Sequence, residues 1–245
     1  MQGFQRALAN GLSTVPWRLA PEVHLFLTDR LACPRCGPDF GLILLADQVE
    51  NQRVTEGRLG CPNCRDQYPI KAGFGDLRVS PRSPLEVSKP GAKEDSLDPE
   101  EALRFAASLG VTSGPGTILV VGPASRYSKA LADLVGGIEV VALDGDGLCR
   151  EESEGVSRMV ASTGIPFFSG SFRGVLVSGK STEGDLKEAV RVLAPSGRVV
   201  VLQGYPGADQ YLSALGLEII LDDDGVLVAQ SNQAEPQPLI TLRGL

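Results

Sequence analysis

Two cysteine pairs in the first third of the sequence constrain its fold more than any other feature. Cys33 and Cys36 lie in a CPRC motif, Cys61 and Cys64 lie in a CPNC motif, and 24 residues separate the two motifs. A tetrahedral metal ion needs four ligands, and two CxxC turns supply four thiolates. Thiolates without histidine favour zinc, with iron as the less common alternative. No ligand position remains for water, so the pattern predicts a structural Zn2+ ion in a small ribbon.

Disulfide bonds and buried free thiols are the alternatives for these cysteines. Four isolated cysteines rarely fall into such paired spacing, and a reducing cytoplasm disfavours disulfides. A bound ion would replace the hydrophobic core that so small a module cannot build. The fifth cysteine, Cys149, is far from both motifs in the sequence, and we expect it to be a small buried apolar residue.

The composition is that of a globular protein with a substantial core. The chain has 245 residues, of which 42% are hydrophobic and 22% charged, and domains commonly contain about 100 to 150 residues, so two unequal domains are expected. No apolar run approaches the roughly 20 residues that cross a bilayer, and the first residues lack a secretion signal. We therefore expect a cytoplasmic protein without membrane contact.

The net charge of −7 is unevenly distributed along the chain. Residues 1–80 hold nine Lys and Arg against eight Asp and Glu, so the remainder carries the acidic excess and is a poor platform for DNA or RNA. A weak case for RNA contact rests on basic residues of the ribbon, although scattered arginines on a solvated surface are the simpler interpretation. These basic residues are Arg35, Arg53, Arg58, Arg65, Lys71 and Arg78.

The chain divides into four segments. Residues 1–80 contain a strand-like VHLFL at 23–27 and the cysteine region, residues 81–100 have the proline-rich charged composition of a linker, residues 101–232 form a second domain, and 233–245 form a tail. Continuous β-branched apolar runs in the second domain alternate with helical segments, which indicates parallel strands joined by crossover helices. The strands are expected at 117–121, 139–143, 174–178, 198–202, 217–221 and 225–230.

The predicted fold class is α/β: a small zinc ribbon followed by a doubly wound, mostly parallel sheet. An amphipathic helix is expected over 125–137, and another should begin near Ser181 and Thr182 and stop at Pro195. Only LDDDG separates the last two strands, and so short a turn predicts an antiparallel hairpin at the edge of the sheet.

Residues 30–79 resemble a known protein family. The stretch GRLGCPNCRDQYPIKAGFGDLR, together with LACPRC, is similar to the zinc-ribbon activator subunit of tRNA, ribosomal RNA and release-factor methyltransferases. Tyr68, Pro69, Ile70, Gly73 and the Asp76–Leu77 pair carry the resemblance. It implies that the ribbon docks on a methyltransferase-type domain, stabilises it, and uses the cysteines as metal ligands.

Residues 117–230 resemble the class I S-adenosylmethionine-dependent methyltransferase fold, and EAVRVLAPSGRVVVL is similar to its helix, turn and strand before the last antiparallel pair. The resemblance implies that Asp144 would bind the ribose hydroxyls of the cofactor and that Gly122 would lie beneath it. The loop VVGPASRYS departs from the family, because Pro123, Ala124, Ser125 and Arg126 stand where further glycines are expected; proline removes an amide donor and Arg126 adds bulk. The methionine part of S-adenosylmethionine would have less room.

No catalytic residue can be named from the sequence. VSGKSTEG stands where amino-directed methyltransferases carry an Asn or Asp followed by two prolines and an aromatic residue, and Lys180 is expected to be exposed. The only histidine, His24, lies outside the second domain, so a general base would have to be a carboxylate. The carboxylates Asp144, Asp146, Glu151 and Glu152 are available, but such clusters are usually solvated.

The loss of glycines favours a pseudoenzyme, a non-catalytic scaffold or regulatory subunit that works with a protein partner or larger assembly. The alternative is an active S-adenosylmethionine-dependent methyltransferase with the ribbon as a built-in activator. A weaker third hypothesis keeps the doubly wound sheet and assigns it another nucleotide.

Overall fold

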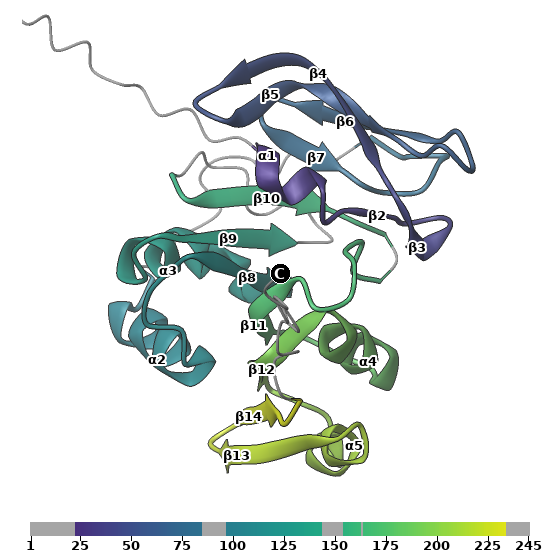
Figure 1. Cartoon of the computed structure of the whole chain (residues 1–245). Coiled ribbons are helices and arrows are strands. Elements are labelled where there is room, and N and C mark those ends of the chain that lie inside the picture. Colours follow the sequence, from purple (N-terminus) through teal and green to yellow (C-terminus); the bar gives the residue numbers. More distant parts are fainter. Residues whose placement is uncertain (1–22, 85–96, 144–153, 163, 234–245) are drawn as a thin grey trace, which may run out of the picture.

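A computed structural model describes residues 23–84, 97–143, 154–162 and 164–233 (Figure 1). The first part of the chain is almost entirely β structure. Its elements are β1 Val23–His24, α1 Leu25–Thr28, β2 Ala32–Cys33, β3 Gly37–Gly41, β4 Ile43–Glu50, β5 Arg53–Gly60, β6 Gln67–Lys71 and β7 Phe74–Asp76.

The second part alternates strands and helices, as the sequence predicts. Its elements are α2 Pro99–Leu109, β8 Gly116–Val121, the 3-10 helix η1 Gly122–Tyr127, α3 Ser128–Leu134, β9 Ile138–Leu143, β10 Val156–Val160, β11 Phe172–Val177, α4 Glu183–Val192, β12 Leu193–Leu202, α5 Ala208–Ala214, β13 Leu217–Asp223 and β14 Val226–Ser231.

Twelve of the described strands form one sheet with the order β1-β5-β6-β7-β10-β9-β8-β11-β12-β14-β13, and β4 pairs with β5 beyond this path. The central strands β10, β9, β8, β11 and β12 run parallel, whereas β14 is antiparallel to β12 and β13. The predicted α/β class, the parallel strands and the terminal hairpin are therefore confirmed.

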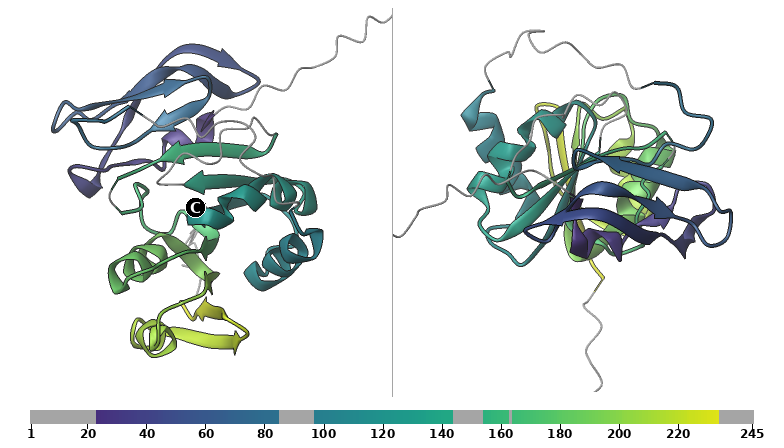
Figure 2. Two further views of the ribbon diagram at one scale, coloured as in Figure 1. Left: turned by 180° about the vertical axis from the view of Figure 1, so that it is seen from behind. Right: turned by 90° about the horizontal axis from the view of Figure 1, so that it is seen from above.

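Helices cover both faces of the parallel region. Helices α2 and α3 lie on one face, and α4 and α5 lie on the other (Figures 1 and 2). Each face has its own core: Phe105 and Leu131 belong to the first, and Leu186 and Leu212 to the second. None of the helices in the described part of the chain has the length and apolar character of a membrane span.

Four local expectations need correction. Strand β10 was not expected, because Ser157 and Arg158 interrupt its apolar pattern although both are buried. Of the strand expected at 23–27, only Val23–His24 is a strand, and α1 follows at once. The helix expected over 125–137 consists of η1 and the shorter α3. Helix α4 ends at Val192, before Pro195, because β12 already begins at Leu193.

The ribbon and the parallel region share one sheet and one core. β7 pairs in parallel with β10, and Leu77 N–H donates to the Val160 carbonyl at 2.8 Å. The second core cluster extends from Tyr68 in the ribbon to Leu212 on α5. Most of the predicted linker and tail lies outside the described residues, so the four segment boundaries stay predictions.

Candidate metal centre and carboxyl edge of the sheet

The four ribbon cysteines converge on one point. The turn between β2 and β3 positions Cys33 and Cys36, the turn between β5 and β6 positions Cys61 and Cys64, and all four Sγ atoms lie within 4.8 Å of one another. The closest pairs join the two turns, with 3.7 Å between Cys33 and Cys64 and 3.8 Å between Cys36 and Cys61. Zinc–sulfur bonds of about 2.3 Å in a tetrahedron place sulfurs ~3.8 Å apart. The donor set therefore fits one tetrahedral ion.

The backbone after each cysteine pair turns in the same way. Gly37 follows Cys36 with φ +92°, and Arg65 follows Cys64 with φ +63°. A non-glycine residue in this region is uncommon, and here two hydrogen bonds hold it: Arg65 N–H donates to the Cys61 carbonyl, and Cys61 N–H donates to the Asp66 carbonyl, both at 3.0 Å. Each turn is thus built to aim two thiolates in one direction.

Neighbouring polar groups orient the sulfurs. The Tyr68 hydroxyl, on a fully buried side chain, lies 3.5 Å from Cys33 Sγ, and Asn63 Nδ2 donates to Cys36 Sγ at 3.3 Å. Burial raises the pKa of the Cys33 thiol, but the hydrogen bond from Tyr68 and those from backbone amides outweigh it and lower the pKa to about 7. Burial and the neighbouring thiols raise the pKa of Cys64 to about 12. A bound cation would stabilise both thiolates.

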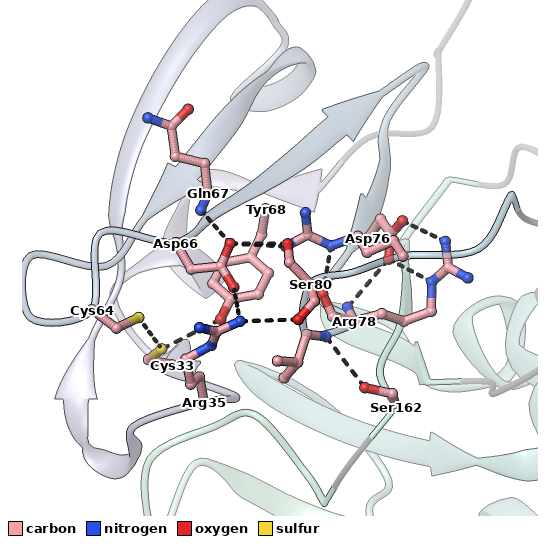
Figure 3. Close-up of polar contacts among 12 residues, drawn as sticks. Cys33, Arg35, Cys64, Asp66, Gln67, Tyr68, Asp76, Arg78, Ser80 and Ser162 are labelled. Carbon is pink, nitrogen blue, oxygen red and sulfur yellow. Dashed lines mark hydrogen bonds and ion pairs between the residues drawn. The ribbon is translucent and has the colours of Figure 1, made fainter.

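A charged cluster centred on Asp66 ties the metal centre to the end of the ribbon (Figure 3). The Asp66 carboxylate accepts from Ser80 Oγ at 3.2 Å and lies 3.4 Å from Arg35 and 3.5 Å from Arg82. Arg82 also lies over the Tyr68 ring, 4.9 Å from its centroid. The residues just beyond β7 are therefore fastened to the turn that carries Cys61 and Cys64.

The second region of interest is the carboxyl edge of β8 and β11. The chain proceeds from β8 outward to β9 and β10 on one side and returns to β11 and β12 on the other, so β8 and β11 flank the topological switch point where open α/β sheets bind ligands. Gly122 opens η1 there with φ +81°, and an added Cβ would collide with the Ser178 carbonyl oxygen.

The two loops at this switch point contact each other directly. Ser178 N–H donates to the Val121 carbonyl at 3.0 Å, and Ala124 N–H donates to Ser178 Oγ at 2.7 Å. The Pro123 ring lies against Gly179, where an added Cβ would be 3.2 Å from Pro123 Cδ. The Ala124 amide, one of the few donors this loop could offer a ligand, is already satisfied within the protein.

Helix α2 covers the same loop from outside. The Tyr127 hydroxyl donates to Glu101, and Phe105 packs edge-on against the Tyr127 ring with 5.2 Å between centroids. Ala124 and Tyr127 are both buried. The loop after β8 is thus packed on two sides, against the loop after β11 and against α2.

The remaining residues named from the sequence lie partly outside the described residues. Asp144, Asp146, Cys149, Glu151 and Glu152 lie outside the described residues, and β9 ends at Leu143, immediately before Asp144. Lys180 is exposed, as expected. Nδ1 of His24 accepts from Phe26 N–H at 3.2 Å and caps α1, and burial lowers the pKa of His24.

Most basic residues of the proposed RNA patch are paired within the protein. Arg35 pairs with Asp66, Arg53 with Glu139, Arg58 with Asp47 and Arg78 with Asp76. The Arg53–Glu139 pair is largely buried and joins β5 to β9 with N–O distances of 2.9 and 2.6 Å. The patch therefore consists mainly of arginines that stabilise the fold.

Sequence reasoning missed the serines at the carboxyl edge. The Ser178 hydroxyl, in the loop after β11, accepts from Ala124 N–H and donates to the Val121 carbonyl at the end of β8. Buried hydroxyls without a hydrogen-bond partner occur after β8, β11 and β12; these are Ser125, Ser128, Ser181 and Tyr205. No spacing signal marks them, because only the strand order brings them to one edge.

No family model and no curated protein matches the sequence. Solved structures with a similar fold include a Methanococcus maripaludis protein described as an S-adenosyl-L-methionine-dependent methyltransferase, with 17% identity, coverage of 57% of this chain and 86% of that one, and a TM-score of 0.42. A tRNA (m1A58) methyltransferase of Aquifex aeolicus has 13% identity, 56% and 70% coverage, and a TM-score of 0.41.

A third similar structure is a chain from the complex between the Haloferax volcanii Trm112 methyltransferase activator and a methyltransferase. It has 14% identity, 55% and 89% coverage, and a TM-score of 0.43. A likeness at this level says nothing about the residues of a site.

Proposed function

We propose that this protein is a zinc-binding, methyltransferase-like scaffold or regulatory subunit that does not itself catalyse methyl transfer. The observation that carries the proposal is the direct packing of the loop after β8 against the loop after β11. Ser178 occupies the Ala124 amide, and Pro123 contacts Gly179, at the position where a cofactor would have to enter. A ligand at the switch point would first have to separate these loops.

The ribbon has a structural role in this proposal. All five residues of β10 are buried, and without β7 this strand would be an unprotected sheet edge. The ion held by Cys33, Cys36, Cys61 and Cys64 would fix the turns on either side of β5 and thereby hold the added strands in place. Zinc would supply folding free energy, and no chemical step is assigned to it.

The partner in this proposal is another protein. Phe40, Ile43 and Leu45, on the consecutive strands β3 and β4, are at least 40% exposed. Exposed apolar side chains that form a contiguous patch are typical of protein contacts. The ribbon would use one side to complete its own sheet and the other to meet the partner.

Isothermal titration calorimetry with S-adenosylmethionine and S-adenosylhomocysteine tests the proposal. The zinc-loaded full chain should show no binding at ligand concentrations up to about 1 mM. A Kd of about 1 mM corresponds to a binding free energy of roughly −4 kcal/mol. Binding in the micromolar range would reject the non-catalytic hypothesis. Zinc content and the melting temperature, measured on the same sample, show that the protein is folded.

An active S-adenosylmethionine-dependent methyltransferase with a built-in activator is the second candidate. The observation in its favour is that the buried hydroxyls of Ser125, Ser128, Ser181 and Tyr205 lack partners at the carboxyl edge. Buried unpaired polar groups are rare and often belong to a functional site. If the cofactor binds in the calorimeter, Asp144→Ala should abolish binding by removing the ribose contacts, whereas Lys180→Ala should leave it unchanged.

A further inference from the structure

A groove on the ribbon lies apart from both the metal centre and the switch point. It has a volume of about 340 Å³, within the usual range of small-molecule sites. Strands β6 and β7 form its floor and the segment 78–84 forms its wall. The lining residues are Pro69, Lys71, Phe74, Asp76, Arg78, Arg82, Ser83 and Pro84.

The floor of the groove is the outer face of the β6–β7 pair. Residues alternate between faces along a strand, and Tyr68 and Ile70 are fully buried on the core side. Pro69 and Phe74 consequently lie on the opposite side, and both are half-buried. A proline and an aromatic ring side by side provide a flat apolar surface suited to a planar ring.

The charges around this floor are mostly positive. Lys71, Arg78 and Arg82 line the groove against the single carboxylate of Asp76, in a protein whose net charge is −7. Asp76 is fully engaged by Arg78, with Nε–Oδ1 and Nη2–Oδ2 distances of 2.8 Å. Hydrogen bonds from Arg78 and its positive charge lower the pKa of Asp76 despite the burial of this carboxyl group, so it stays ionised. Its negative charge is balanced by Arg78 and adds little repulsion toward an anionic ligand.

Two cationic groups remain for a ligand. Lys71 is exposed, and its side chain makes no hydrogen bond or ion pair with any described residue. Arg78, which also lines the groove, uses Nε and Nη2 for Asp76, and its Nη1 makes no hydrogen bond with a described residue. Figure 3 shows the Asp76–Arg78 pair beside Ser80, with its guanidinium held in place by both oxygens of the carboxylate. A fixed guanidinium and a mobile ammonium beside a flat apolar floor suit a phosphate attached to a planar ring.

We propose that this groove binds a nucleotide unit, with the base on Phe74 and Pro69 and the phosphate near Lys71 and Arg78. A free nucleotide and a nucleotide within a single strand share this chemistry. An acidic peptide would satisfy the cations but would offer no planar ring to the floor. The proposal does not depend on whether the switch point binds a cofactor.

Fluorescence polarisation on the zinc-loaded full chain tests the proposal with two labelled probes and two competitors. Labelled AMP and a labelled six-nucleotide single-stranded RNA represent the two sources, and adenosine and polyglutamate serve as competitors. AMP should bind, adenosine should compete at least tenfold more weakly than AMP, and affinity should fall as KCl rises. Tighter binding of the oligonucleotide would assign the groove to a strand, and similar affinity would assign it to the free nucleotide.

Three variants make the result specific to the groove. Lys71→Glu, on an exposed side chain, and Phe74→Leu, which keeps an apolar group, should each weaken binding at least tenfold. Lys180→Glu removes an equally exposed lysine after β11 and should change affinity less than twofold. Unchanged zinc content and melting temperature will show that each variant folds. Absence of binding for both probes at 1 mM, equal competition by polyglutamate, or full affinity in both groove variants would overturn the proposal.

Discussion

At the scale of single residues, Cys61 is a buried side chain of the core cluster, 3% exposed, and its Sγ lies 3.8 Å from that of Cys36. In the proposed function it is one of four ligands of a single zinc ion. Cys61→Ser should therefore reduce bound zinc from about one ion per chain to near zero after dialysis, and should destabilise the fold by several kcal/mol.

The control for this substitution is Cys149→Ser, which changes the one cysteine outside the two CxxC motifs. Elemental analysis and thermal melts of both variants measure the effect. Retention of one zinc ion by the Cys61→Ser protein would contradict the ligand assignment.

Substitution of Gly122 tests whether the loops after β8 and β11 are in contact at the switch point. Gly122 has φ +81° and Gly225 has φ +74°, so both adopt the left-handed conformation. An added Cβ at Gly122 would meet the Ser178 carbonyl of another loop, whereas a Cβ at Gly225 would have no atom within 4 Å. Gly225→Ala should cost about 1 kcal/mol through backbone strain alone, whereas Gly122→Ala should cost roughly 2 to 4 kcal/mol from strain and the steric clash. Chemical denaturation of both variants gives the comparison, and equal losses would mean that the two loops are not in contact.

At the scale of elements, the parallel strands that the sequence predicts are largely buried, whereas β13, which is also predicted, is mostly exposed. β8, β9, β11 and β12 are continuous apolar runs and needed no partner to be recognised. β10 was missed because Ser157, fully buried, is satisfied by Glu139 at 2.6 Å and by the amide of His24 at 3.1 Å. Those partners come from other strands, so local patterning carries no sign of them.

The contrast between local sequence patterns and long-range contacts also applies to the cysteine cluster and to the switch point. The convergence of the four cysteines could be predicted because each turn brings together two cysteines only three residues apart, and local spacing carries that information. The closure of the switch point could be predicted only in part. The sequence reveals the loss of glycines at Pro123 and Ala124, but the contact with Ser178 depends on the register between β8 and β11.

Helix α4 is attached to the loop before β11 by a small charged network. Arg191 donates to the carbonyls of Phe167 and Ile165 at 2.7 and 2.8 Å and pairs with Glu188. Arg191 lowers the pKa of Glu188, against the opposing effect of its partial burial. Because the folded pKa is below the unfolded value of about 4.3, the carboxylate stabilises the fold above that pH, and the contribution is lost as pH falls through the folded pKa.

Glu188→Gln should therefore destabilise the protein by about 0.5 to 1 kcal/mol at pH 7, a modest value because the carboxylate is partly solvated. The difference from wild type should shrink toward zero as the pH falls from about 5 to 3. Urea titrations across this range measure it, with Asp185→Asn on the opposite end of α4 as a comparison for the helix cap. A difference that stays constant with pH would show that the Glu188 charge does not matter.

At the scale of the whole molecule, the four-cysteine cluster and the parallel sheet share one core. Cys33, Tyr68 and Met159 share a core cluster with Leu212 and Ala229 at the far end of the sheet. The Arg53–Glu139 pair, with both side chains less than 15% exposed, adds a second connection between β5 and β9. Loss of one partner of such a buried pair typically costs several kcal/mol, so the ribbon is held to the sheet by more than strand pairing.

Removal of the metal should therefore destabilise the entire protein and not only the ribbon. After chelation, the melting temperature should fall by at least about 10 °C, since several kcal/mol of lost stability corresponds to shifts of about 2 to 4 °C per kcal/mol in a domain of this size. Near-ultraviolet circular dichroism, which includes the buried Tyr68, and far-ultraviolet signals from the helices should change in a single coincident transition. Restoring zinc should restore the melting temperature, which separates metal loss from damage by the chelator. An early ribbon transition that leaves helical signal intact would mean that β10 is stable without β7 beside it, and the ribbon would then be an attachment rather than part of the core.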